Sequence, residues 1–436
     1  MSFPAYPIYK DSGAEWLGQV PNHWKLVRLK NVLASKVSDG PHTTPEFLDE
    51  GIPFLSVDGI QDGNLIFEGC RYVSEDAHRE YSKKTAPRRD DLLMGKAAST
   101  GKIARVKVDF EFSIWSPLAL IRPNVEQVVP TFLENVLKSP RVQAGIDVLC
   151  TSNTQKNISM DDIPRLSFPL PPIDEQIHIG RFLDHETAKI DALIQEQERL
   201  IGLLDEDRSA SVANLLLGGR YSKKKASGIE WIGNIPEHWH VARVCNMFTE
   251  STELGGDGLP VLSVSIHDGV SDKELNDDEL DRKVTRSEDR GKYKRVRSGD
   301  LVYNMMRAWQ GGFGSVEVDG LVSPAYVVAR PSCNISTKYV ESVLRTCNAI
   351  VEMKSRSRGI TDFRLRLYWE EFRDVRIPVP PLSEQVEILE QINSMDERVF
   401  LLKAEATKLI ALLTERRLAL ISSAVTGKID VRGLNV

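Results

Sequence analysis

Polar stretches in both halves of the chain could recognise the edges of DNA bases. Arginine or lysine suits guanine, asparagine or glutamine suits adenine, and serine or threonine suits either. The first half offers Lys83, Lys84, Arg88, Arg89, Ser99, Thr100, Lys102, Ser152, Asn153, Thr154, Gln155 and Lys156. The second half offers Arg307, Trp309, Gln310, Arg356, Arg358, Thr361 and Arg364. An ordinary solvated surface explains any single one of them. For the whole set, loops at matching places with different side chains make a solvated surface harder to accept, but composition alone does not favour base recognition.

Motifs for catalysis are incomplete. The segment Gly95–Lys102 resembles a phosphate-binding loop, but its spacing is one residue too long and Ile103 replaces the magnesium-binding hydroxyl. Neither an adenine-methyltransferase motif nor a serine-hydrolase or zinc-protease motif is present. His178 and His185 could hold a metal, although a solvated charged helix face is the simpler interpretation. We therefore expect no catalytic residue, no metal site and no cofactor bound by this chain.

Composition indicates a globular protein of two or three domains. The chain has 436 residues, of which 41% are hydrophobic and 27% charged. Its net charge of -6 neither supports nor excludes DNA binding, because the distribution of charge matters more than its sum. Five scattered cysteines and the lack of a membrane-length apolar run predict a cytoplasmic protein without disulfides.

An internal repeat organises the sequence. Residues Ser12–Trp24 return as Ser227–Trp239, and Pro169–Gln176 return as Pro378–Gln385. Short β-branched runs lie between these flanks and lead into an amphipathic helix in both copies. We predict two copies of one mixed α/β domain with different surfaces, over 1–173 and 218–382. Each repeated His-Trp pair should pack its tryptophan against the base of a neighbouring helix.

Two long helices are predicted after the double prolines, over 174–217 and within 383–436. Asp174 and Ser383 are plausible N-caps, and Gly218 and Gly427 suit the residue after a helix. Heptad-like spacing predicts a coiled coil. Its expected seam is Leu183, Glu186, Ile190, Leu193, Leu200 and Leu204 against Ile392, Met395, Val399, Leu402, Leu409, Leu413 and Arg416. The alternative is that each helix packs separately on its own domain.

An antiparallel alignment of the two helices would place the charged residues of the seam opposite each other. Full overlap of 176–217 with 385–426 places Glu186 opposite Arg416, so that each charge neutralises the other. Leu402→Asp should then disrupt the helix pair, because it buries a charge in a packed seam.

The ordered motifs together resemble the specificity subunits of type I restriction–modification systems. They are Glu-Trp-Leu/Ile-Gly-x-Val/Ile-Pro-x-His-Trp at 15–24 and 230–239, Pro-x-Pro-Pro-x-x-Glu-Gln before both helices, and the closing residues 425–432. The resemblance implies two target recognition domains, each reading one half of a split, asymmetric DNA site. It also implies an antiparallel coiled coil that spaces them, two adenine methyltransferase subunits, and possibly two restriction subunits. S-adenosylmethionine, magnesium and ATP would belong to those partners.

Other functions remain open on the sequence alone. The main alternative is a standalone, repressor-like protein that binds a bipartite DNA site without enzymatic partners. A scaffold that has lost DNA binding is another, whereas the missing motifs disfavour a fused nuclease–methyltransferase. A methyltransferase encoded beside this chain would separate the specificity subunit from the repressor and the scaffold.

Overall fold

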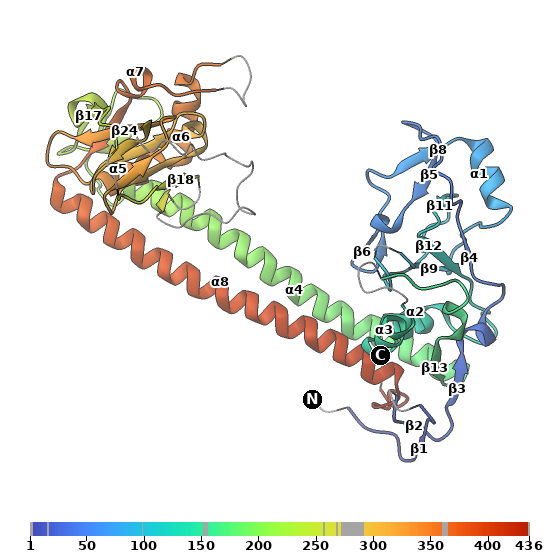
Figure 1. Ribbon diagram of the computed structural model, residues 1–436. Helices are drawn as coiled ribbons and strands as arrows, with labels where there is room; N and C mark the ends of the chain where they lie inside the picture. Colours follow the sequence, from blue (N-terminus) through green and yellow to red (C-terminus); the bar gives the residue numbers. More distant parts are fainter. Residues whose placement is uncertain are drawn as a thin grey trace. The chain divides into compact units, whose positions relative to one another are not determined.

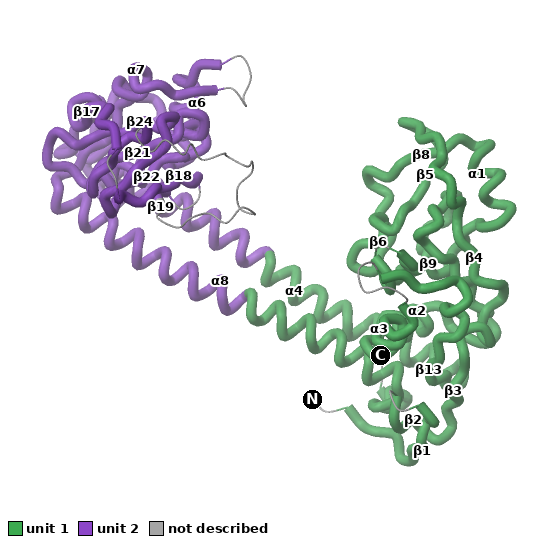
Figure 2. The backbone as a smooth tube through the Cα atoms, in the orientation of Figure 1, with its two compact units in different colours: residues 1–198, 407–436 green, residues 199–406 purple. Residues whose placement is uncertain are grey.

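Two long helices and two sets of short strands make up the computed structural model (Figure 1). It describes residues 3–14, 17–97, 99–150, 156–255, 258–266, 269–271, 292–359 and 365–434. The chain divides into two compact units, coloured separately in Figure 2. Unit 1 comprises residues 1–198 with 407–436, and unit 2 comprises 199–406. Each unit therefore contains one copy of the repeat and one end of both long helices.

Unit 1 is built on a four-stranded antiparallel sheet in the order β10-β9-β12-β4. These strands are Ile103–Arg105, Leu92–Gly95, Leu118–Ile121 and Ser38–Asp39. A second sheet, β11-β5-β8, contains Ser113–Ile114, Ile52–Leu55 and Arg71–Val73. The paired short strands are β1 (Tyr9–Asp11) with β2 (Gln19–Pro21), β3 (Lys25–Arg28) with β13 (Ser167–Leu170), and β6 (Ile60–Gln61) with β7 (Asn64–Leu65). The helices are α1 (Glu75–Ser82), α2 (Pro130–Lys138) and α3 (Pro140–Leu149).

Unit 2 contains a four-stranded antiparallel sheet in the order β17-β24-β21-β22. Its strands are Phe248–Ser251, Tyr326–Pro331, Leu301–Asn304 and Phe313–Ser315. The paired strands are β14 (Lys224–Ala226) with β15 (Asn234–Pro236), β16 (His240–Arg243) with β25 (Arg376–Val379), β18 (Ser263–Ser265) with β19 (Gly269–Ser271), and β20 (Lys294–Val296) with β23 (Gly320–Val322). The helices are α5 (Thr337–Leu344), α6 (Cys347–Arg356) and α7 (Trp369–Phe372).

The two units repeat one topology. Read from opposite ends, the two four-stranded sheets place their strands in the same chain order, and two consecutive helices follow each sheet. Each unit also encloses its own apolar core, with Trp24 and Phe132 in unit 1 and Trp239 and Phe372 in unit 2. The prediction of a duplicated mixed α/β fold is confirmed.

The long helices are α4 (Ile173–Leu216) and α8 (Leu382–Val425). Both begin one residue before the N-caps predicted at Asp174 and Ser383, so these two residues lie in the first turn instead. None of the helices in the described ranges is long and apolar enough to cross a membrane.

Inside each unit, α4 and α8 run antiparallel. In unit 1 the start of α4 pairs with the end of α8, where Arg417 Nε lies 2.8 Å from Asp191 Oδ1. In unit 2 the end of α4 pairs with the start of α8, where Arg208 donates two hydrogen bonds of 2.6 and 2.9 Å to Asp396. The predicted antiparallel coiled coil is confirmed.

The seam contains only part of the predicted set. Leu183, Ile190, Ile392 and Leu413 are buried. Leu204, Met395 and Val399 are half-buried, and so is Glu186. By contrast, Leu193, Leu200, Leu402 and Leu409 are 40–52% exposed, and Arg416 is exposed too. These five positions were therefore predicted wrongly.

The neighbouring residue takes the inward place at most of these positions. Ile194, Ile201 and Ile410 are half-buried, and each directly follows one of the exposed leucines. Two adjacent apolar residues fit a helical repeat equally well, so the spacing could not choose between them. The predicted pair of Glu186 with Arg416 is also wrong, because Lys189 binds Glu186 at 2.7 Å and Arg417 makes the ion pair across the helices.

A buried carboxylate anchors the first turn of α4. Glu175 Oε1 accepts hydrogen bonds from the hydroxyl of Tyr6 and from Trp24 Nε1, the latter at 3.1 Å. His23 Nε2 lies 2.7 Å from Glu175 Oε2. The tryptophan therefore packs at the base of the helix, as the repeated His-Trp pair predicts.

The same arrangement recurs at the start of α8 in unit 2. Glu384 accepts hydrogen bonds from Tyr221 at 2.7 Å and Trp239 at 2.9 Å, and His238 Nε2 lies 2.8 Å away. Burial alone would raise the pKa of Glu384, but the hydrogen bonds from Tyr221, Trp239 and His238 outweigh it and lower the pKa.

Inside unit 1, the N-terminal segment is hydrogen-bonded to the residues that follow α8. Tyr9 donates a 3.0 Å hydrogen bond to the carbonyl of Gly427, and the Asp430 N–H donates to the Pro4 carbonyl at 2.7 Å. Gly427 has a φ of 72°, and a Cβ there would lie 2.3 Å from Pro21 Cδ. Gly218 meets Pro236 in the same way after α4. Residues 3–14 and 17–24 thus follow α8 in space as residues 218–239 follow α4 in sequence.

Candidate nucleic-acid interface

In unit 1, two of the predicted DNA-reading segments lie side by side. The loop 96–102 connects β9 with β10, and residues 156–158 return after α3. The Ile158 N–H donates to the Lys96 carbonyl at 3.0 Å, and Ala97 forms a β-bridge with Asn157. Thr100 Oγ1 donates to the Lys156 carbonyl at 2.6 Å. Segments more than 50 residues apart in sequence therefore share one surface.

In unit 2, a backbone hydrogen bond joins the loop between two strands to the segment after α6, as in unit 1. The loop 305–312 connects β21 with β22 and contains the short helix η6 (Ala308–Gln310). The Leu367 N–H donates to the Met305 carbonyl at 2.9 Å, which ties this loop to the segment that follows α6. Both units therefore place a strand-connecting loop against a post-helical segment.

The surface of unit 2 is rich in guanidinium groups. Arg307 donates a 2.9 Å hydrogen bond to Gln310 Oε1, and Lys354 Nζ lies 5.4 Å from the centre of the Trp309 ring. Arg356 forms a 2.6 Å ion pair with Glu352 within α6. Arg307, Trp309, Gln310, Arg356 and Arg358, which sequence analysis selected, thus belong to one pair of segments.

The corresponding surface of unit 1 has different chemistry. Lys156 forms a 2.7 Å ion pair with Asp147, and Lys102 is exposed with its ammonium 3.3 Å from the Ile60 carbonyl. Ser99 and Thr100 supply hydroxyl groups in the same loop. Six predicted residues lie outside the described ranges, namely Ser152, Asn153, Thr154, Gln155, Thr361 and Arg364.

Four predicted cations of unit 1 lie apart from the paired segments in sequence, and Lys83, Arg88 and Arg89 also lie apart from them in their contacts. Lys83 pairs with Glu80 at 2.5 Å, and Arg89 pairs with Asp109 at 2.7 Å. Arg88 and Arg89 precede β9, whereas the loop 96–102 follows it, so they belong to the opposite end of that strand.

Lys84 is the member of these four that connects to the loop. Its ammonium binds Asp39 Oδ1 at 2.5 Å, and Lys96 binds the other oxygen of the same carboxylate. Burial would raise the pKa of Asp39, but the hydrogen bonds from Lys84 and Lys96 outweigh it and lower the pKa. Lys84 and Lys96 therefore stabilise the base of the loop through a shared acid.

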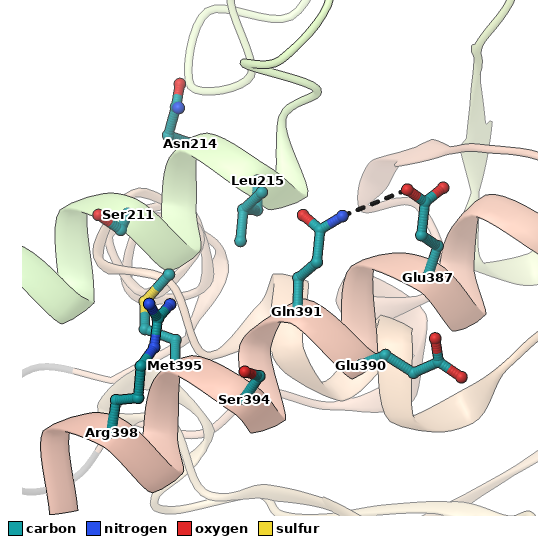
Figure 3. A pocket seen from close by; sticks show the side chains of 9 residues that line it. All are labelled: Ser211, Asn214, Leu215, Glu387, Glu390, Gln391, Ser394, Met395 and Arg398. Carbon is teal, nitrogen blue, oxygen red and sulfur yellow. Dashed lines mark hydrogen bonds between the residues drawn. The ribbon is translucent and has the colours of Figure 1, made fainter.

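A groove of about 550 Å³ lies elsewhere in unit 2, between α4 and α8 (Figure 3). Glu387, Glu390, Gln391 and Arg398 line one side of it, and Gln391 donates a 3.2 Å hydrogen bond to Glu387. It contains none of the predicted DNA-binding residues. An open, largely polar groove of this kind does not have the enclosed apolar walls typical of a small-molecule site.

Sequence reasoning missed Lys354 and Glu371 as parts of the unit 2 surface. Lys354 stacks on Trp309, and Glu371 binds Arg358. The regular alternation of Lys354, Arg356 and Arg358 was a usable signal for the lysine. The sequence contained no such signal for Glu371, because this residue comes close to Arg358 only in the folded chain.

These observations describe two similar α/β units, each presenting a pair of joined segments with its own side chains. Residues 21–201 match the family described as the type I restriction modification DNA specificity domain. The chain is similar to the specificity subunits of type I restriction–modification systems.

Individual relatives show the extent of this similarity. The chain is 24% identical over 201 residues to the type I restriction enzyme EcoBI specificity subunit of Escherichia coli, which covers 46% of this chain and 42% of that protein. It is 22% identical over 434 residues to the putative type I restriction enzyme MjaX specificity subunit of Methanocaldococcus jannaschii, covering 95% of this chain and 96% of the other. A chain from a solved type I restriction–modification system shares the fold, with a TM-score of 0.60 and 17% identity, over 93% of this chain and 98% of that one.

Proposed function

We propose that this chain is the DNA sequence-recognition subunit of a type I restriction–modification complex and performs no chemistry itself. The observation that carries the proposal is the pair of joined segments at matching places in both units. Thr100, Lys102 and Lys156 supply hydroxyl and ammonium groups in unit 1, whereas Arg307 and Arg358 supply guanidinium groups in unit 2. These are groups that contact base edges and phosphates.

Two unlike recognition surfaces require a target with two unlike halves. A symmetric dimer reads a palindrome, because both of its reading surfaces are identical. Here one chain supplies two surfaces on the same topology but with different side chains. We therefore expect a bipartite, asymmetric site, with a gap whose length depends on the two helices that both units share.

Exposed apolar residues on the long helices support the docking of partner subunits. Leu409, Leu412 and Leu418 are exposed on the part of α8 in unit 1, and Phe400 and Leu401 on the part in unit 2. Apolar side chains clustered on a helix surface mark protein contacts. The partners proposed are two adenine methyltransferase subunits and possibly two restriction subunits.

The cofactors of the complex belong to these partners in the same proposal. They would bind S-adenosylmethionine, magnesium and ATP, while this chain selects the DNA site. The five free cysteines suit the reducing cytoplasm, where such a complex would meet its DNA.

Methylation mapping tests the proposal directly. Genomic DNA is sequenced for methyladenine from cells that express this chain with its methyltransferase subunit, and from cells that lack only this chain. We expect a split motif with a fixed gap that is methylated only when the chain is present. Arg307→Ala should change one half of that motif, whereas Arg398→Ala, a control in the groove of Figure 3, should change neither half.

The standalone repressor-like protein is the competing function. It predicts that the isolated chain binds a bipartite site tightly, and that no methylated motif depends on it. A missing motif together with a clear footprint of the isolated chain would replace our proposal with that one.

A further inference from the structure

Two arginines of unit 2 stand directly opposite each other. The Arg358 N–H donates to the Arg366 carbonyl and the Arg366 N–H donates to the Arg358 carbonyl, both at 2.9 Å. In such an antiparallel pair the Cα atoms lie about 5.5 Å apart and both side chains project from the same face. Leu365 and Leu367 on either side of Arg366 are buried, so the arginines point outward, where both are exposed.

Like charges at this spacing destabilise a strand pair unless something compensates them. Glu371 compensates one of the two, because its Oε1 forms an ion pair with Arg358 Nη2. Arg366 has no carboxylate within 4 Å among the residues that the structure describes. Among the described residues the pair is therefore incompletely neutralised, and an acceptor supplied from outside the chain would relieve the remaining repulsion.

The two arginines differ in what they can bind. The Arg358 side chain is 74% exposed although one of its nitrogens is held by Glu371, which is 14% exposed. The rest of its guanidinium faces outward in a fixed orientation. A nearby carboxylate repels a phosphate, but it leaves the remaining donors free for the neutral acceptors O6 and N7 of guanine. No carboxylate in the described ranges pairs with Arg366, and its guanidinium suits a phosphate.

This pair is attached to the predicted DNA-reading loop. The Leu367 N–H, one residue after Arg366, binds the Met305 carbonyl at the start of the loop that contains Arg307 and Trp309. In unit 1 the residue at the place of Arg366 is Asn157, since it likewise precedes the residue that binds the loop. The arginine pair is thus a specific feature of unit 2.

We propose that Arg358 reads a guanine in the half-site of unit 2, that Arg366 contacts a phosphate beside it, and that Glu371 is a positioning residue for Arg358. This inference rests on the proposed function. It names a base that the target contains and the side chain that selects it.

The test uses the full chain assembled with its methyltransferase subunit. Methylated motifs are mapped for Arg358→Ala, and the affinity of the purified complex is measured on DNA carrying each base at every position of the motif. We expect Arg358→Ala to relax one G·C position of one half-site, with discrimination there falling about 10- to 100-fold. Arg366→Ala should weaken binding to all sequences alike, and lower the slope of log affinity against log salt by about 1.

Glu371→Gln separates positioning from a merely structural role. Loss of the carboxylate should reduce discrimination at the same G·C position, yet raise the affinity for unrelated DNA, because a group that repels phosphate is gone. A structural defect would instead lower both.

Arg79→Ala is the matched control. Arg79 is 72% exposed and pairs with Asp76 in unit 1, so its loss should leave the half-site of unit 2 unchanged. If Arg358→Ala prevents assembly, Arg358→Lys keeps the charge but not the fork and should relax the same position. Retained discrimination at every position in the soluble arginine variant overturns the inference. A wild-type chain that directs no motif overturns the proposed function instead.

Discussion

Two adjacent leucines of α8 should differ sharply in their contribution to stability. Leu413 is 8% exposed and packs in the core of unit 1 with Leu183 and Ile190, whereas Leu412 is 52% exposed. Replacement of leucine by alanine removes three carbons, each worth about 0.8 kcal/mol when buried. With the cavity that remains, Leu413→Ala should cost about 3–5 kcal/mol. Leu412→Ala should cost about 1 kcal/mol or less.

Urea unfolding of the isolated chain, followed by the helical circular dichroism signal, measures this difference. Both variants make the same chemical change in the same helix, so the change in helix propensity cancels between them. Leu413→Ala should shift the unfolding midpoint of unit 1 clearly below that of Leu412→Ala. Equal shifts, or a larger shift for Leu412→Ala, would refute the assignment of Leu413, and not Leu412, to the seam between α4 and α8.

Three further predictions follow from the helices and their ends. Leu402→Asp should leave the fold intact, because Leu402 is half exposed; a collapse of the circular dichroism signal would contradict this. Gly427→Ala should destabilise unit 1 by more than about 1 kcal/mol in thermal unfolding, since φ is positive and Pro21 occupies the space of a Cβ. Hydrogen bonds that outweigh burial lower the pKa of Glu384, so its stabilisation is present above the unfolded value of 4.5 and is lost as pH falls through the lower folded value. Glu384→Gln should lessen that acid destabilisation of unit 2, and an unchanged pH profile of the urea midpoint would argue against it.

The duplicated fold and the helix pair could be predicted because both depend on patterns that recur along the chain. The repeated Trp24 and Trp239 mark the same structural position twice, and the double prolines mark where each helix begins. Where a seam position has an apolar neighbour, the spacing did not decide which of the two lies in the seam, so Leu413 was predicted correctly beside Leu412 but Leu409 was predicted wrongly beside Ile410. Ile190 has no such neighbour and is buried as predicted, whereas Leu200 has Ile201 beside it and is exposed.

The segments proposed to bind DNA were selected from the sequence, but the contacts between these segments could not be predicted from it. The loop of Arg307 and the segment of Arg358 were both selected from sequence, since their side chains can bind DNA. Their junction through Met305 depends on a backbone hydrogen bond that no residue type encodes. The carboxylate of Glu371 beside Arg358 likewise follows from packing between segments, so base-reading chemistry alone could not identify it.

The division of the chain into units has a consequence for folding during synthesis. Unit 2 is one continuous stretch, 199–406, so all of its contacts become available as soon as that stretch has left the ribosome. Unit 1 needs residues 407–436, which are made about 200 residues after the rest of it. Until then Tyr9 lacks Gly427, and the core cluster that contains Leu183 and Ile190 lacks Leu413 and Leu420. The first-made unit should therefore be the last to close, and its exposed apolar surface should be the part that depends most on chaperones.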